Sequence, residues 1–143
     1  MKASLFPTPE AAERGFYQAV EQADLTAMMA VWEDSEAIVC IHPLGPRLLG
    51  TAQVRESWRR IFSSGVQLRF RIDGVRQLAQ DDLAVRIVYE NITVLGAEEQ
   101  PAQPVITTHV FRQGRQGWRL VLHHAAPGPA PDSRQDRRSG WVH

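Results

Sequence analysis

The chain lacks several features that would assign it quickly to a class. Its 143 residues hold one cysteine, Cys40, which excludes an intramolecular disulfide framework. Lysine plus arginine and aspartate plus glutamate number 16 each, so the basic excess that nucleic-acid binding requires is missing. No stretch approaches the ~18–20 apolar residues of a membrane span, and Met1–Pro7 has no apolar signal core. We therefore expect a cytoplasmic protein that binds neither nucleic acid nor membrane.

The residues that are present are typical of one globular domain. A hydrophobic share of 43% over 143 residues is enough for a single core. The end of the chain is rich in proline and then in charge, beginning with Pro127-Gly128-Pro129, which is typical of an extended tail. We expect a lead over 1–7, a folded domain over 8–126 and a tail over 127–143. Trp141 leaves open whether the tail docks on the body or on a partner.

Apolar residues recur at three- and four-residue steps in three segments, which predicts three helices. Helices are expected over 9–23, 25–32 and 51–62, with Thr8, Asp24 and Thr51 as their capping residues. A proline directly after Thr8 suits the first helical position. Residues 43–50, between the second and third helices, contain glycine and proline and are expected to form a loop, after a strand over 37–42.

The apolar period changes from helical to two after residue 65, which predicts a sheet. Strands are expected over 68–80 with a bulge near Gly74, and over 83–95, 105–112 and 118–125. Short connections between successive strands imply an antiparallel meander. Helices first and an antiparallel sheet afterwards make an α+β domain.

The segment that ends at His42 is the best candidate for a functional site. Pro43 disfavours the helical region for His42, which places the imidazole at the end of an extended run. A neutral imidazole titrates near pH ~6.5, so it can act as an acid or a base at neutral pH. The alternative is a ring that only bonds a neighbouring carbonyl. Cys40 lies in the same apolar run, which favours a small buried side chain over a catalytic thiol.

Four groups of residues at the joints of these elements form a recognisable set. They are Phe16-Tyr17-Gln18-Ala19-Val20 with Ala23-Asp24-Leu25, Trp32-Glu33-Asp34, His42-Pro43-Leu44-Gly45 with Gly50-Thr51, and Gly117-Trp118-Arg119-Leu120-Val121-Leu122-His123-His124. With these motifs the chain resembles the nuclear-transport-factor-2-like (NTF2-like) superfamily, and within it the SnoaL-like branch that includes ketosteroid isomerases and polyketide cyclases. The resemblance implies a cone-shaped, curved antiparallel sheet wrapped around the N-terminal helices. It also implies an apolar pocket at the open end and a homodimer through the outer sheet face.

Only part of the isomerase active site has a counterpart in this sequence. The carboxylate base of that branch stands before a Pro-x-Gly, and His42 occupies this place here. The phenol donor of the first helix falls on Phe16, which has no hydroxyl, and the second oxyanion donor aligns best with Thr108. Because both donors are lost or weakened, the resemblance argues against ketosteroid isomerisation.

The resemblance implies a pocket lined by aromatic and polar side chains: Trp32, His42, Trp58, Tyr89, Thr108, His109 and His124. His123 and His124 point to opposite faces of a strand, so at most one of them enters the pocket. No histidine spacing matches a metal motif, and no metal or cofactor is expected. Arg69 and Arg71, with Arg86 and Glu90, are expected on the outer sheet face.

Two classes of function remain open at this point. The first is cofactor-free isomerase, cyclase or dehydratase chemistry on a small apolar or carbonyl-containing molecule, with His42 as the acid or base. The second is a module without catalysis, which either binds a small ligand or assembles as a homodimer. The sequence does not decide whether the chain is an enzyme.

Overall fold

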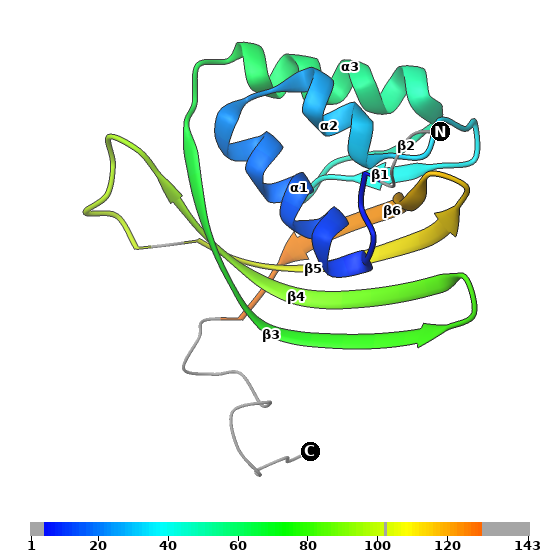
Figure 1. The fold of residues 1–143 in the computed structure, drawn as a ribbon. Coiled ribbons are helices and arrows are strands. Elements are labelled where there is room, and N and C mark those ends of the chain that lie inside the picture. Colours follow the sequence, from blue (N-terminus) through cyan, green and yellow to red (C-terminus); the bar gives the residue numbers. More distant parts are fainter. Residues whose placement is uncertain (1–4, 102, 130–143) are drawn as a thin grey trace, which may run out of the picture.

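The chain folds into helices packed on one face of a single curved sheet (Figure 1). The computed structural model describes residues 5–101 and 103–129, so Trp141 and most of the expected tail lie outside the described residues. In chain order the elements are α1 Pro9–Gln22, α2 Leu25–Val31, β1 Val39–Ile41, β2 Arg47–Leu49, α3 Gly50–Ser63, β3 Leu68–Gln80, β4 Leu83–Val94, β5 Gln103–Gly114 and β6 Gly117–Pro127. Each helix in these residues is too short or too polar to serve as a membrane-spanning segment.

The first two helices begin where their capping residues predict. The Thr8 hydroxyl accepts a hydrogen bond from the Ala11 amide at 3.0 Å, and Asp24 Oδ1 accepts one from the Ala27 amide at 2.9 Å. Both bonds satisfy amides of a first helical turn, which have no partner inside the helix.

The expected cap of the third helix is wrong. Leu49 is the capping residue of α3, and its amide donates to Gln53 Oε1 at 2.9 Å. Thr51 lies inside the helix, where its hydroxyl donates to Asp34 Oδ1 at 3.0 Å and accepts from the Ser35 amide at 3.0 Å. The hydroxyl of Thr51 therefore ties α3 to the segment between α2 and β1.

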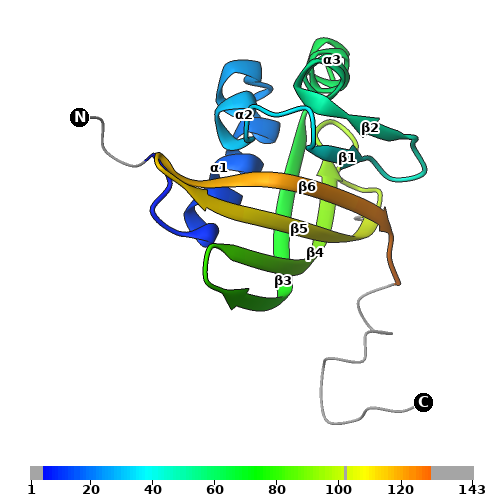
Figure 2. The ribbon, with the colours of Figure 1, turned by 90° about the vertical axis from the view of Figure 1, so that its right-hand side faces the viewer.

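The strands lie in the order β2-β1-β6-β5-β4-β3. The run from β3 to β6 is the predicted antiparallel meander, and the register shift between Asp73 and Arg76 confirms the bulge near Gly74. Two features of the sheet differ from the expectation. β1 pairs in parallel with β6, and β2 forms inside the segment expected to be a loop. The helices all cover the same face of this sheet (Figure 2).

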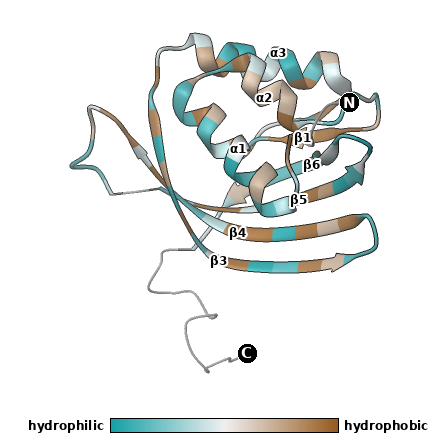
Figure 3. Cartoon of the chain, viewed as in Figure 1, coloured by the Kyte–Doolittle hydropathy of each residue, from teal (hydrophilic) through white to brown (hydrophobic). Residues whose placement is uncertain are grey.

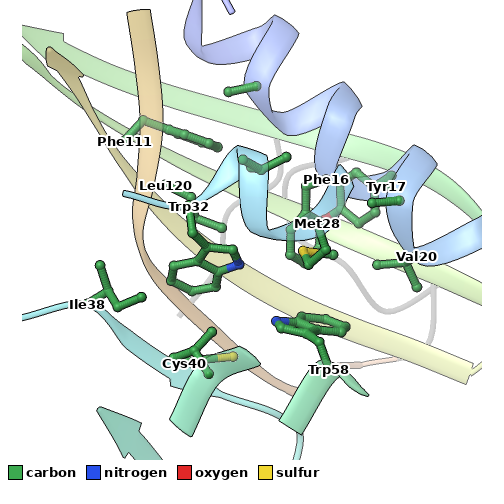
Figure 4. Close-up of a cluster of buried hydrophobic side chains, with 14 of the residues drawn as sticks. Phe16, Tyr17, Val20, Met28, Trp32, Ile38, Cys40, Trp58, Phe111 and Leu120 are labelled. Carbon is green, nitrogen blue, oxygen red and sulfur yellow. The ribbon is translucent and has the colours of Figure 1, made fainter. Parts of the chain in front are cut away.

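The core lies between that inner sheet face and the helices. Its largest buried side chains come from the helical first part of the chain and from β5 and β6, and include Phe16, Met28, Trp32, Ile38, Phe111 and Leu120 (Figure 4). Along β4 the buried residues alternate with half-buried ones, so Ala84, Arg86, Val88 and Glu90 face the helices. The expected outer-face position of Arg86 and Glu90 is therefore wrong.

Candidate functional site

A cavity of about 180 Å³ opens between the helices and the inner face of the sheet. Most of its lining is apolar and aromatic. The lining residues are Phe16, Val20, His42, Pro43, Trp58, Ile61, Leu68, Phe70, Glu90, Ile92, His123 and Ala125. Three of them can gain or lose a proton: His42, Glu90 and His123. They come from three separate parts of the sheet, so only the folded chain brings them together.

His42 reaches the cavity from the end of β1. Its Nε2 lies 3.1 Å from the Ser57 hydroxyl, and that hydroxyl donates its own proton to the Val54 carbonyl at 2.8 Å. Since a hydroxyl has one proton, Ser57 accepts from His42, which assigns the hydrogen to Nε2 and leaves Nδ1 as the basic nitrogen. Burial lowers the pKa of His42 below its ordinary value, so the ring is neutral at pH ~7.

Cys40 lies beside His42 but is not a nucleophile. Its Sγ is 3.7 Å from His42 Nε2, and the side chain is fully buried. Burial raises the pKa of the Cys40 thiol to about 12, so the reactive thiolate is not formed at neutral pH. This agrees with the interpretation of Cys40 as a small buried side chain.

Glu90 supplies a carboxyl group to the cavity wall. The Tyr17 hydroxyl on α1 donates to Glu90 Oε2 at 2.5 Å. Burial raises the pKa of Glu90, and the hydrogen bond from Tyr17 offsets only part of that effect. The same burial, together with the negative charge of Glu90, raises the pKa of Tyr17 well above its ordinary value. The pair therefore holds its protons more tightly than exposed groups do.

His123 connects the cavity to a second polar cluster behind it. His123 Nδ1 lies 2.9 Å from His109 Nε2, and His109 Nδ1 lies 2.9 Å from Glu13 Oε2. The other oxygen of Glu13 accepts from Arg86 Nε at 2.9 Å. Burial opposes ionisation of Glu13, but its bonds to His109 and Arg86 together hold its pKa below the ordinary value. Burial also lowers the pKa of His123 well below its ordinary value.

The structure brings only part of the expected pocket together. Among the predicted residues, His42 and Trp58 line the cavity, with their ring centres 4.8 Å apart. His109 lies on the inner face but one layer behind the cavity, and Trp32 packs in the core at 1% exposure.

Tyr89, Thr108 and His124 lie on the outer face of the sheet and away from the cavity, which corrects their expected place in the pocket. Side chains alternate along a strand, so the neighbours Glu90, Thr107 and His123 point inward instead. If a residue is aligned one position off along a strand, its side chain is assigned to the opposite face of the sheet. Sequence reasoning therefore missed Glu90 as a pocket residue, and it selected His124 where His123 lines the cavity.

The polar side chains of this site do not form a metal centre. Within residues 5–101 and 103–129, no three His, Cys, Asp or Glu side chains are placed to hold a metal ion. The rings of His42 and His123 have their centres 6.1 Å apart. The arrangement is suited to hydrogen bonding and proton transfer.

Comparison with known proteins gives the family of this domain. Residues 10–130 match the family of SnoaL-like domains. The chain belongs to the SnoaL-like family. The resemblance seen in the sequence is thereby confirmed, as is the cone-shaped α+β fold of the NTF2-like superfamily.

Two solved structures are similar to this SnoaL-like domain over nearly their whole length. One, from Thiobacillus denitrificans, is described as a candidate calcium/calmodulin-dependent protein kinase type II association domain. It is 41% identical with a TM-score of 0.81, over 90% of this chain and 100% of that one. The other, from Streptomyces avermitilis, is described as a candidate dehydratase of the NTF2-like family. It is 30% identical with a TM-score of 0.76, over 85% and 94% of the two chains.

A curated relative is the F-box protein SKIP8 of Arabidopsis thaliana. It is 27% identical over 111 residues, which is 78% of this chain. The chain spans about half the length of this relative, 46% of it.

Proposed function

We propose that this SnoaL-like domain binds a small, largely apolar molecule with a carbonyl group and moves a proton on it without a cofactor. The observation that carries the proposal is the convergence of His42, Glu90 and His123 on one otherwise apolar cavity. Apolar pockets with a few convergent polar groups and shifted pKa values are typical of sites that process small molecules.

The roles of the proposed groups follow from their protonation. His42 is neutral at pH ~7 and acts as the base, through the nitrogen that Ser57 does not occupy. Glu90 keeps its proton to a higher pH than an exposed glutamate, so it donates a hydrogen bond to the oxygen that gains negative charge. Tyr17 donates to Oε2 of Glu90, and Thr107 on β5 also interacts with this carboxyl, so both side chains hold it at the cavity wall. A dehydratase, isomerase or cyclase step needs such an acid and base.

The size of the cavity limits the ligand. A dry protein cavity of about 150 Å³ holds benzene, and this one measures about 180 Å³. The rings of Phe16, Trp58 and Phe70 stand in its wall. We therefore expect a molecule of the size of a single ring. The similar structure described as a candidate dehydratase supports this class of chemistry.

The test is deuterium exchange into a single-ring ketone. Cyclohexanone is incubated with the protein in deuterated water, and NMR follows replacement of the hydrogens next to the carbonyl. We expect His42→Ala to slow the exchange by about 10²–10⁴-fold, the range of general acid–base catalysis. The matched control is His124→Gln, which changes an exposed histidine on the opposite sheet face and leaves the rate unchanged.

Two results would contradict the catalytic role. Equal exchange rates for the wild type and His42→Ala would remove His42 from the mechanism. Binding of cyclohexanone without any exchange above the rate in buffer would favour the module that binds a ligand and does not turn it over.

A homodimer through the outer sheet face is a second proposal, supported by one observation. Paired residues form an apolar row across that face: Leu78, Val85, Val110, Leu122 and Val39. Contiguous apolar patches on a surface mark interaction sites, and a twofold axis lets the same patch cover itself. This assembly is compatible with the cavity function because the cavity opens on the other face.

A further inference from the structure

Three buried side chains form a hydrogen-bonded chain that starts at the cavity and ends at an ion pair. His123 lines the cavity, His109 lies behind it with 0% exposure, and Glu13 closes the chain from α1. The two links, His123 to His109 and His109 to Glu13, are 2.9 Å each. The proposed reaction uses His42 and Glu90 and gives no role to this second cluster.

The positions of the protons in this chain can be assigned step by step. Arg86 has donors only, and its Nε–H bonds one oxygen of the Glu13 carboxylate. The other carboxylate oxygen also accepts, so His109 donates from Nδ1 and keeps a lone pair on Nε2. His123 must then donate from its Nδ1, which leaves its Nε2 as an acceptor. Within the part of the chain that the structure describes, no hydrogen bond occupies His123 Nε2.

Resting on the proposed function, we propose that His123, His109 and Glu13 form a proton relay that gives the cavity a second proton acceptor beside His42. A bond to hydrogen that His42 does not attack breaks, its electron pair stays on the ligand, and its proton binds His123 Nε2. The proton on His123 Nδ1 then moves to His109 Nε2. His123 ends neutral in the opposite tautomer, and His109 ends as an imidazolium beside the Glu13 carboxylate. The reverse sequence returns a proton to the product.

The relay moves the positive charge from His123, at the apolar cavity wall, to His109. A positive charge on His123 would lie against the apolar cavity wall, and burial disfavours it there. On His109 the same charge lies 2.9 Å from a carboxylate. The other titratable or charged groups around the two imidazoles are Tyr17, His42, Arg86, Glu90 and His124. Of these, Tyr17 and Glu90 gain negative charge on ionisation, and an ionised Glu90 favours the charged His109 ring.

The experiment is imidazole ¹⁵N NMR on protein labelled at histidine, with no ligand added. At neutral pH we expect His109 and His123 both to carry hydrogen on Nδ1 and none on Nε2. On acidification, one event is expected to protonate His109 Nε2 and His123 Nε2 together while His123 Nδ1 loses its proton. A doubly protonated His123, or hydrogen on either Nε2 at neutral pH, would overturn the relay.

A substitution at Glu13 gives a second, directional readout. In Glu13→Gln the amide oxygen must face Arg86, so the amide nitrogen faces His109 and donates to it. We expect both tautomers to reverse, which places a hydrogen on His123 Nε2 at the cavity. Glu10→Gln, an exposed position on the same helix, is the control and leaves both tautomers unchanged. Unreversed tautomers in folded Glu13→Gln would also overturn the relay.

The wild-type titration decides the relay even where Glu13→Gln does not fold. It also separates the relay from the proposed function, because it uses no ketone. An absence of ketone exchange would contradict the proposed function and leave the tautomer result standing.

Discussion

Two buried glutamates on the inner side of the sheet show how neighbours set the chemistry of one residue type. Glu13 has Arg86 and His109 as partners, which outweigh its burial and lower its pKa. Glu90 has Tyr17, whose hydrogen bond does not outweigh burial, so its pKa is raised. The same type of side chain therefore loses its proton more readily in one place and less readily in the other, because its neighbours differ.

The raised pKa of Glu90 predicts a pH-dependent gain in stability on substitution. A group with a raised folded pKa stabilises the fold below its unfolded value, and this contribution is lost as the pH rises through the folded value. Glu90→Gln cannot ionise, so its free energy of unfolding should rise relative to that of the wild type as the pH increases above 4.5, the ordinary glutamate value. Urea unfolding at several pH values measures the difference.

Glu36→Gln provides the comparison for Glu90, since Glu36 is exposed. The difference in free energy of unfolding between Glu36→Gln and the wild type should stay constant over the same pH range. A constant difference between Glu90→Gln and the wild type over the same pH range would show that Glu90 does not titrate there.

At the level of helices and strands, the sequence predicted the start of a helix correctly where a single capping residue determines it. Thr8 and Asp24 each cap a helix through a bond three residues along the chain. Thr51 has the same chemistry, but its hydroxyl is used by a segment sixteen residues earlier, which no local pattern reveals. β2 is three residues long and next to a proline, too short for a period to be detected.

Which side chains of each strand point to the inner face of the sheet was harder to predict, and this determines which residues line the cavity. On β4 both sides are apolar: Ala84 and Val88 face the core, while Val85 and Ile87 face outward. Hydrophobic and hydrophilic residues both occur along β4 (Figure 3). Because apolar residues lie on both of its faces, alternation gives no signal for which face is the inner one. Glu90 and His123 face inward because tertiary partners and the register across β5 place them there. The fold class, the helices and His42 were predictable, and the polar side of the cavity was not.

The bonds of Thr51 predict a measurable role in joining α3 to the chain before β1. Thr51→Val removes the hydroxyl that bonds Asp34 and the Ser35 amide while keeping the shape of the side chain. We expect a loss of about 1–2 kcal/mol in the free energy of unfolding, the size of one or two such bonds. Thr51→Ser keeps the hydroxyl and should lose less than half of that. Urea unfolding of the three proteins gives the comparison, and equal values for Thr51→Val and the wild type would refute it.

For the whole molecule, our proposals give the two faces of the sheet separate roles. The inner face packs on the helices and carries the cavity with its acid and base groups. The outer face carries the apolar row through Val85, Val110 and Leu122, with Tyr89, Thr108 and His124 on the same side. Three residues expected in the pocket thus belong to the surface that we propose for the second copy.

The proposed dimer can be tested at the middle of this row. Val110→Lys places a charge between Val85 and Leu122, and burying it in an interface would be costly. We expect light scattering to give a dimer for the wild type at micromolar concentration and a monomer for Val110→Lys, with the same circular dichroism. Gln113→Lys, at an exposed position of the same strand, should remain a dimer. A monomeric wild type would contradict the interface.

The parallel pairing of β1 with β6 has a consequence for the order in which the chain folds. Among the described residues, β1 joins the meander through β6, the last strand of this range, and the link from Glu13 to His109 spans 96 residues. Contacts between residues this far apart in sequence form only after a long loop has closed, which costs conformational entropy. Folding is therefore slower than for a chain with local contacts. A ribosome-bound chain that stops before β6 already holds Glu13 and its partners Arg86 and His109. In that chain β1 has no strand of the meander to pair with, and His109 lacks His123. The cavity is therefore complete only after β6, which carries His123, has joined the sheet.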